Sequence, residues 1–96
     1  MMLSESVGKK LILVTGGTGF IGSRCVFELA KRGYRVRVAD PASPAERGLL
    51  FPASVEFMQG SMSDPDFAQS VLNGTDTVLH LAANIGSLGY MHERQA

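Results

Sequence analysis

The stretch Val14-Thr15-Gly16-Gly17-Thr18-Gly19-Phe20-Ile21-Gly22 predicts how this chain folds. It follows an apolar run, Leu11–Val14, and leads into a segment with the periodicity of a helix. In a strand–turn–helix unit, the first N–H groups of the helix have no intrahelical acceptor, and the helix dipole adds partial positive charge at the same end. The sequence therefore predicts a cradle for an anion such as a pyrophosphate.

The glycines of this stretch have steric roles. We expect Gly16 to allow a tight exit from the strand, Gly19 to let the backbone approach a phosphate, and Gly22 to let the helix pack closely on the strand. Gly17, Gly19 and Gly22 also fit the G-x-G-x-x-G spacing. A glycine turn without a ligand is the alternative, but the flanking strand and helix patterns favour a dinucleotide site.

Asp40 lies 18 residues after Gly22 and ends the next apolar alternation. In this kind of unit, an acidic residue there accepts hydrogen bonds from the adenosine ribose hydroxyls. Its carboxylate would repel a 2′-phosphate, so we expect NAD rather than NADP as the dinucleotide. The alternative is a solvated turn residue, because Asp-Pro often opens a loop.

Apolar runs and turn signals predict four strands separated by helices. Three right-handed crossovers would give the strand order 3-2-1-4, which is a Rossmann-like α/β fold with a parallel sheet and helices on both faces. A ligand would then bind outside the carboxyl ends of strands one and four. The expected strands are Lys10–Val14, Tyr34–Asp40, Val55–Gln59 and Thr77–Leu81, and the expected helices are Phe20–Arg32, a two-turn helix over 44–50, one from Asp64-Pro65 to Asn73-Gly74, and Tyr90–Ala96 after the loop Asn84–Gly89.

The 96 residues allow one small domain. We expect a flexible tail over residues 1–8 and a partial dinucleotide-binding domain over 9–96. Formal net charge is zero and no basic stripe is present, which argues against nucleic acid as a partner. No apolar run is long enough to span a membrane and the start lacks a signal-peptide core, so we expect no membrane partner and a cytoplasmic protein.

Cysteine and histidine usage points to no metal. Cys25 is the single cysteine, and we expect it to be a buried thiol on one helix face with Ile21 and Leu29. No group of His, Cys, Asp and Glu has metal-ligand spacing. His80 is expected to support local structure rather than to perform chemistry.

Together these motifs resemble the extended short-chain dehydrogenase/reductase superfamily, and within it the NAD-dependent epimerase/dehydratase family that acts on nucleotide sugars. The segments that carry the resemblance are Lys10–Gly22, Tyr34–Asp40, Asp76–Ala83 and, less well matched, Gly60–Asp64. The resemblance implies that the glycines hold the pyrophosphate and that Asp40 binds the ribose. The cofactor-binding residues it implies are Gly16, Gly19, Phe20, Ile21 and Gly22 at the pyrophosphate, Asp40 at the ribose, Ser61 and Met62 beside the adenine, and Leu81, Ala82 and Ala83 beyond the fourth strand.

The sequence departs from this family in two ways. Ser61 stands where the family usually has an aspartate that binds the adenine amino group, which puts adenine selectivity in doubt. The family's catalytic Y-x-x-x-K is absent, since Val38 follows Tyr34 and Arg94 follows Tyr90 at the lysine position. The resemblance therefore implies the NAD-binding portion of a nucleotide-sugar epimerase/dehydratase-type oxidoreductase, with no catalytic residues and no activity of its own. A non-catalytic dinucleotide-binding sensor or regulatory module is the alternative.

The fourth strand is expected to leave an open sheet edge. Without a further strand beside it, Val78, Leu79 and Leu81 would border this edge. Uncovered apolar edges pair with other chains. We therefore expect either self-association or coverage of strand four by the remainder of a longer chain.

Overall fold

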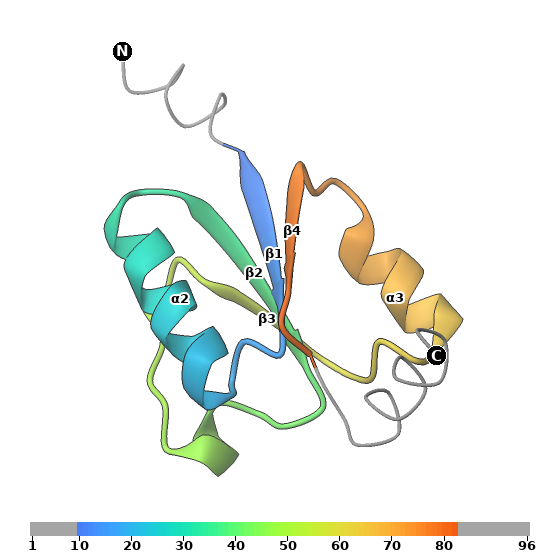
Figure 1. Ribbon diagram of the computed structural model, residues 1–96, viewed down its shortest axis with the longest axis horizontal. Helices are drawn as coiled ribbons and strands as arrows, with labels where there is room; N and C mark the ends of the chain where they lie inside the picture. Colours follow the sequence, from blue (N-terminus) through green and yellow to red (C-terminus); the bar gives the residue numbers. More distant parts are fainter. Residues whose placement is uncertain (1–9, 83–96) are drawn as a thin grey trace, which may run out of the picture.

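The computed structural model describes residues 10–82, which form a sheet with helices on both sides (Figure 1). The expected tail, the loop Asn84–Gly89, the helix Tyr90–Ala96 and Ala83 lie outside the described residues. In chain order, the elements are β1 (Leu11–Thr15), α2 (Phe20–Lys31), β2 (Arg35–Asp40), the 3-10 helix η1 (Ala45–Arg47), β3 (Glu56–Gln59), α3 (Pro65–Leu72) and β4 (Thr77–His80).

The strands form one parallel sheet in the order β3-β2-β1-β4, which confirms the predicted topology. All five residues of β1 are buried, as expected for a central strand covered on both faces. Figure 1 shows α2 on one side of the sheet and α3 on the other. The fold is therefore Rossmann-like, and every strand ends at the same edge of the sheet.

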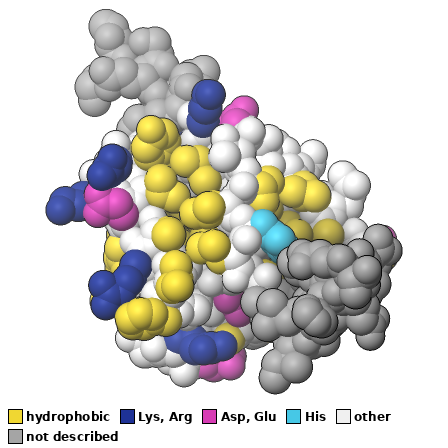
Figure 2. Space-filling model, in the orientation of Figure 1, with side chains coloured by type: hydrophobic (Ala, Val, Ile, Leu, Met, Phe, Trp, Pro, Cys, Tyr) yellow, Lys and Arg dark blue, Asp and Glu magenta, His cyan; other side chains and the backbone are white. Residues whose placement is uncertain are grey.

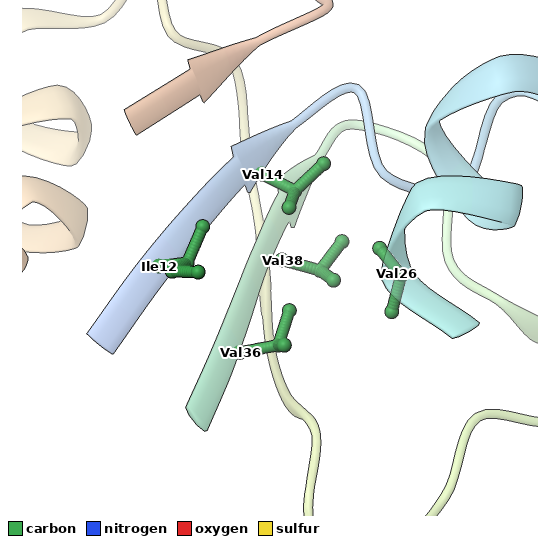
Figure 3. Packing of buried hydrophobic residues seen from close by; sticks show 5 residues of the cluster. All are labelled: Ile12, Val14, Val26, Val36 and Val38. Carbon is green, nitrogen blue, oxygen red and sulfur yellow. The ribbon is translucent and has the colours of Figure 1, made fainter. Parts of the chain in front are cut away.

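Two clusters of apolar side chains form the core, one on each face of the sheet. Between the sheet and α2, Val26 points toward residues of β1 and β2, with Ile12, Val14, Val36 and Val38 around it (Figure 3). Between the sheet and α3 the cluster is smaller and consists of Leu13, Ala39 and Val71. β1 and β2 contribute to both clusters, so these two strands carry most of the core.

The buried face of α2 differs from part of the prediction. Gly22, Ser23 and Val26 are buried, whereas Cys25 is half-buried and Ile21 is 64% exposed. The expectation of a buried thiol is therefore wrong. The reason is that α2 packs over β1 and β2, so its row Ile21–Cys25–Leu29 faces the sheet edge, where β4 offers mainly Leu79.

The segment 44–50 contains a shorter helix than predicted. Ser43 and Glu46 form a capping box at its start: the Glu46 N–H donates to Ser43 Oγ at 3.2 Å, and the Ser43 N–H donates to Glu46 Oε2 at 3.2 Å. Only Ala45–Arg47 is helical, and it is 3-10. Gly48 ends it because its φ of 68° is left-handed, a conformation that stops a helix.

Helix α3 begins as predicted, with Asp64 as its N-cap accepting a hydrogen bond from the Asp66 N–H at 3.0 Å. Phe67 and Val71 face the core. Leu72 is apolar as well but is 40% exposed. Because it follows Val71 by one position, it is rotated about 100° around the helix from the buried row.

Candidate functional site

The glycine loop joins β1 to α2 in little space. Gly16 has a φ of 73°, and its N–H donates to the Ala39 carbonyl of β2 at 2.8 Å. A Cβ on Gly22 would overlap the Gly16 carbonyl oxygen, so the first turn of α2 lies directly against the loop. The tight exit expected at Gly16 and the close helix packing expected at Gly22 are both present in this geometry.

Gly19 differs from these glycines because the fold itself hardly requires it. Its φ is −74° and its ψ is 176°, which other residues adopt readily. A Cβ there would meet a single atom within 4 Å, the Gly16 carbonyl oxygen at 3.3 Å. The first N–H groups of α2, at Phe20, Ile21 and Gly22, have no intrahelical acceptor because they begin the helix. The N-cap, Gly19, has no side chain that could accept from them instead. This opening suits a ligand anion that approaches the backbone closely.

Asp40 is fixed beside the glycine loop at the carboxyl end of β2. It is 7% exposed, and its Oδ2 accepts the Thr18 N–H at 3.2 Å while its Oδ1 accepts the Ala42 N–H at 2.9 Å. Thr18 Oγ1 donates to the Ala42 carbonyl at 3.1 Å, which ties the loop to the segment after β2. Each carboxylate oxygen keeps acceptor capacity for ligand hydroxyl groups. The alternative of a solvated turn residue does not fit a side chain this buried.

The segment after β3 lies beside Asp40. The Gly60 N–H donates to the Asp40 carbonyl at 3.1 Å. Ser61 is exposed, and its hydroxyl lies 2.7 Å from that of Ser63 and accepts the Ser63 N–H at 3.2 Å. The side chain of Met62 packs against the core cluster under α3. Their contact with an adenine ring stays a prediction.

The backbone after β4 lies on the other side of the glycine loop. A Cβ on Gly16 would stand 2.7 Å from the Ala82 nitrogen and 2.8 Å from the Leu81 carbonyl carbon. Leu81 also packs against the core cluster under α2. Ala83, the third residue predicted here, lies outside the described residues.

These predicted residues meet at one edge of the sheet, where parallel strands place their carboxyl ends. The glycine loop occupies the centre, Asp40 flanks it on β2, and Leu81 and Ala82 flank it after β4. From β1 the chain proceeds to β2 and β3 on one side, and it then returns to place β4 on the other side of β1. Parallel sheets bind ligands at such a switch point, here between β1 and β4. Chemically, this edge offers backbone N–H donors for an anion and a buried carboxylate for hydroxyl groups.

Two residues that organise the site were missed as candidates, Thr15 and Thr18. Both are buried: the Thr18 hydroxyl donates to the Ala42 carbonyl while its backbone N–H donates to Asp40, and the Thr15 hydroxyl accepts backbone N–H groups after β4. The sequence held a signal for each of them. Thr15 is a polar residue directly after an apolar run, and Thr18 is a polar residue within the glycine turn. Buried hydroxyl groups of this kind need partners, so each indicates a neighbouring segment.

Across residues 10–82, no group of three or more His, Cys, Asp and Glu side chains is arranged to hold a metal ion. No helix in this part of the chain has both the length and the apolar character needed to cross a membrane.

An apolar groove separates α2 from the sheet edge. Figure 2 shows hydrophobic side chains gathered on this face. The charged residues that line it, Arg24 and Glu28, belong to α2. Arg32 donates a hydrogen bond to the Glu28 carboxylate at 2.8 Å and so lowers the pKa of Glu28 from its ordinary value. On its far side, β4 pairs with no strand among the described residues. The groove is lined by Ile21, Arg24, Cys25, Glu28, Leu29 and Leu79.

Comparison with known proteins identifies relatives of this fold and site. A model of the NAD dependent epimerase/dehydratase family matches residues 12–96. A 3 beta-hydroxysteroid dehydrogenase/Delta 5→4-isomerase of Mycobacterium tuberculosis is 40% identical over 89 residues, covering 91% of this chain and 22% of that protein. A UDP-glucose 4-epimerase of Halalkalibacterium halodurans is 39% identical over 75 residues, covering 76% of this chain and 22% of that protein.

Among solved structures, the Bordetella bronchiseptica enzyme WbmG in complex with NAD has a TM-score of 0.70 and 28% identity, covering 80% of this chain and 26% of that one. The chain thus spans about a quarter of the length of the proteins it matches, 22% of each of the two enzymes above. The residues matched by the family model include the glycine loop, Asp40 and, apart from Leu11, the four strands. The chain therefore belongs to the NAD dependent epimerase/dehydratase family.

Proposed function

We propose that this chain is the NAD-binding portion of an epimerase- or dehydratase-type oxidoreductase whose longer form acts on a nucleotide sugar. One observation carries the proposal: the open first turn of α2 after Gly19 lies beside the buried carboxylate of Asp40. A pyrophosphate on the first and a ribose on the second would lie side by side, as they do in a dinucleotide. When bound, NAD would accept or return a hydride at a sugar carbon.

The electrostatics of the ribose end support NAD over NADP. The Asp40 carboxylate accepts hydrogen bonds from two backbone N–H groups, which hold it at the carboxyl end of β2. A 2′-phosphate placed there would face this negative charge. The first basic residue after Asp40 is Arg47, seven positions later.

The substrate would be bound by parts of a longer protein. The similarity to a UDP-glucose 4-epimerase supports a nucleotide sugar. A hydroxysteroid is the second candidate, supported by the 40% identity to the mycobacterial dehydrogenase. By itself, the 96-residue chain is expected to bind NAD weakly. It is also expected to have no turnover, because it has no Y-x-x-x-K motif. A reducing cytoplasm would suit its free thiol, Cys25.

The enzyme proposal is tested in a longer protein that contains this chain. Hydride transfer between NAD and UDP-glucose, dependent on a tyrosine and lysine beyond residue 96, would support it. Turnover of a hydroxysteroid alone would favour the second candidate. Binding of NAD with no turnover of either class would instead favour a sensor or regulatory module.

We further propose that the remainder of a longer chain covers the apolar groove and the free edge of β4. The length of the relatives supports this, since the chain matches 22% of each of the two enzymes. Exposed apolar residues of α2 at the groove include Ile21, which is 64% exposed. When the 96-residue chain is studied alone, a second copy would take the place of the missing cover.

Gly19→Val is expected to abolish NAD binding while the protein stays folded. The added side chain would stand where the phosphate must lie, so we expect affinity to fall by about a hundredfold or more. Isothermal titration calorimetry measures the loss, and Ala53→Val, in the exposed loop before β3, is the matched control. For the unaltered chain, NAD at about a hundred times its dissociation constant should raise the free energy of unfolding by about 2.7 kcal/mol. Undiminished binding by Gly19→Val would contradict the proposed pyrophosphate site.

Asp40→Asn is expected to weaken NAD binding about tenfold and to reduce the preference for NAD over NADP. Both effects follow from losing a charged acceptor, since hydrogen bonds to charged groups contribute about 1.5–3 kcal/mol. Titration of each variant with NAD and NADP measures the ratio of affinities. Glu28→Gln removes a carboxylate from the exposed surface of α2 and is expected to leave that ratio unchanged. An unchanged ratio in Asp40→Asn as well would refute the ribose assignment.

Val78→Lys is expected to shift the 96-residue chain from self-associated species toward monomer. Val78 lies in the edge strand β4 and is 43% exposed, and a charge on such a strand disfavours pairing. Analytical ultracentrifugation over a range of concentrations measures the shift. Leu50→Lys introduces the same charge at a residue that is 90% exposed and serves as the control. A monomeric unaltered chain at high concentration would argue against an uncovered edge.

A further inference from the structure

The hydroxyl group of Thr15 joins the end of β1 to the backbone after β4. Thr15 is fully buried, and its Oγ1 accepts the Leu81 N–H at 3.1 Å and the Ala82 N–H at 3.2 Å. The same oxygen lies 2.6 Å from Nδ1 of His80, the last residue of β4. One side chain therefore contacts three consecutive residues of the neighbouring segment.

These contacts determine the tautomer of His80. A threonine hydroxyl has two acceptor sites and one proton. The Ala82 N–H and the Leu81 N–H, which is shared with the Thr15 carbonyl oxygen, both approach Oγ1 as donors, so the partner left for the hydroxyl proton is Nδ1 of the imidazole. Nδ1 then acts as the acceptor, an arrangement in which the imidazole proton is on Nε2. His80 and the two N–H groups together satisfy the whole hydrogen-bonding capacity of the Thr15 hydroxyl.

The segment that Thr15 holds is one wall of the glycine loop. The Leu81 N–H also donates to the Thr15 carbonyl oxygen at 3.0 Å. The backbone of Leu81 and Ala82 lies so close to Gly16 that a Cβ there would come within 2.8 Å of it. Loss of the Thr15 hydroxyl would leave the Ala82 N–H without this acceptor and free the wall to move.

We infer that Thr15 and His80 are positioning residues for the half of the dinucleotide that lies beyond the pyrophosphate. This inference rests on the proposed function. Asp40 on β2 places the adenosine half on one side of the glycine loop, so the other half must cross β1 toward β4. There it meets the wall of Leu81 and Ala82. Thr15 itself is buried beneath that wall and acts through it.

The first test compares a whole dinucleotide with one half of it. Thr15→Val keeps the shape of the side chain and removes the hydroxyl, and Thr15→Ser restores it. We expect Thr15→Val to lower the affinity for NAD about tenfold, the effect of leaving one buried donor unsatisfied, and to leave the affinity for ADP unchanged. Thr15→Ser should recover most of the NAD affinity. Thr75→Val, which removes a hydroxyl that donates to the Leu72 carbonyl, is the control.

Equal loss of NAD and ADP binding in Thr15→Val would overturn the inference, because it would indicate general damage to the site. An unchanged affinity for both ligands would overturn it too. Only a selective loss of NAD that serine reverses supports a positioning role.

A second test needs no ligand and separates this inference from the proposed function. Nitrogen-15 NMR of the unaltered chain should show Nδ1 of His80 without a proton, and amide exchange at Leu81 and Ala82 should accelerate in Thr15→Val but not in Thr15→Ser. A proton on Nδ1, or unchanged exchange in Thr15→Val, would refute the anchoring. Failure of the unaltered chain to bind both NAD and ADP would instead contradict the proposed function, while the NMR result would still decide whether Thr15 holds the wall.

Discussion

The chain leaves β1 through a bend so tight that a side chain on Gly16 would overlap the backbone of Leu81 and Ala82. The rest of the site depends on this steric constraint. The bend directs the chain straight into α2, and Gly22 lets the helix lie against it. The first N–H groups of α2 are thereby brought to the edge of the sheet, between the ends of β2 and β4. A looser connection would carry the helix end away from both strands.

Two buried threonines fix the two sides of this bend through hydrogen bonds. The Thr18 backbone N–H donates to the Asp40 carboxylate, and its hydroxyl donates to the Ala42 carbonyl after β2. The Thr15 hydroxyl accepts the N–H groups of Leu81 and Ala82 after β4. Each hydroxyl lies in a buried position where an unpaired polar group would be costly, so each one keeps its neighbour in place. The backbone N–H groups of Thr18 and Ala42 orient the side chain of Asp40 before any ligand arrives. Preorganisation of this kind reduces the entropy lost on binding.

Much of this arrangement is predictable from the sequence, because the strongest patterns are local. The four apolar runs and the right-handed crossover rule predict the sheet order, and the glycine spacing with Asp40 at the end of β2 predicts the position of the site. The exposed row of α2 was not predictable, since Ile21 and Cys25 recur with the same period as Gly22 and Val26. Which row is buried depends on how far the sheet extends beneath the helix. The role of Thr15 also depends on a neighbour 66 positions away, Leu81, which no local pattern reveals.

The central claim is that the open N–H groups at the start of α2 bind the diphosphate of NAD. Its most direct test follows the backbone amide signals of the 96-residue chain by NMR while NAD is added. The largest shifts should occur at Phe20, Ile21 and Gly22, and inorganic pyrophosphate should reproduce them. Saturable binding of NAD that leaves these three amides unchanged would contradict the claim.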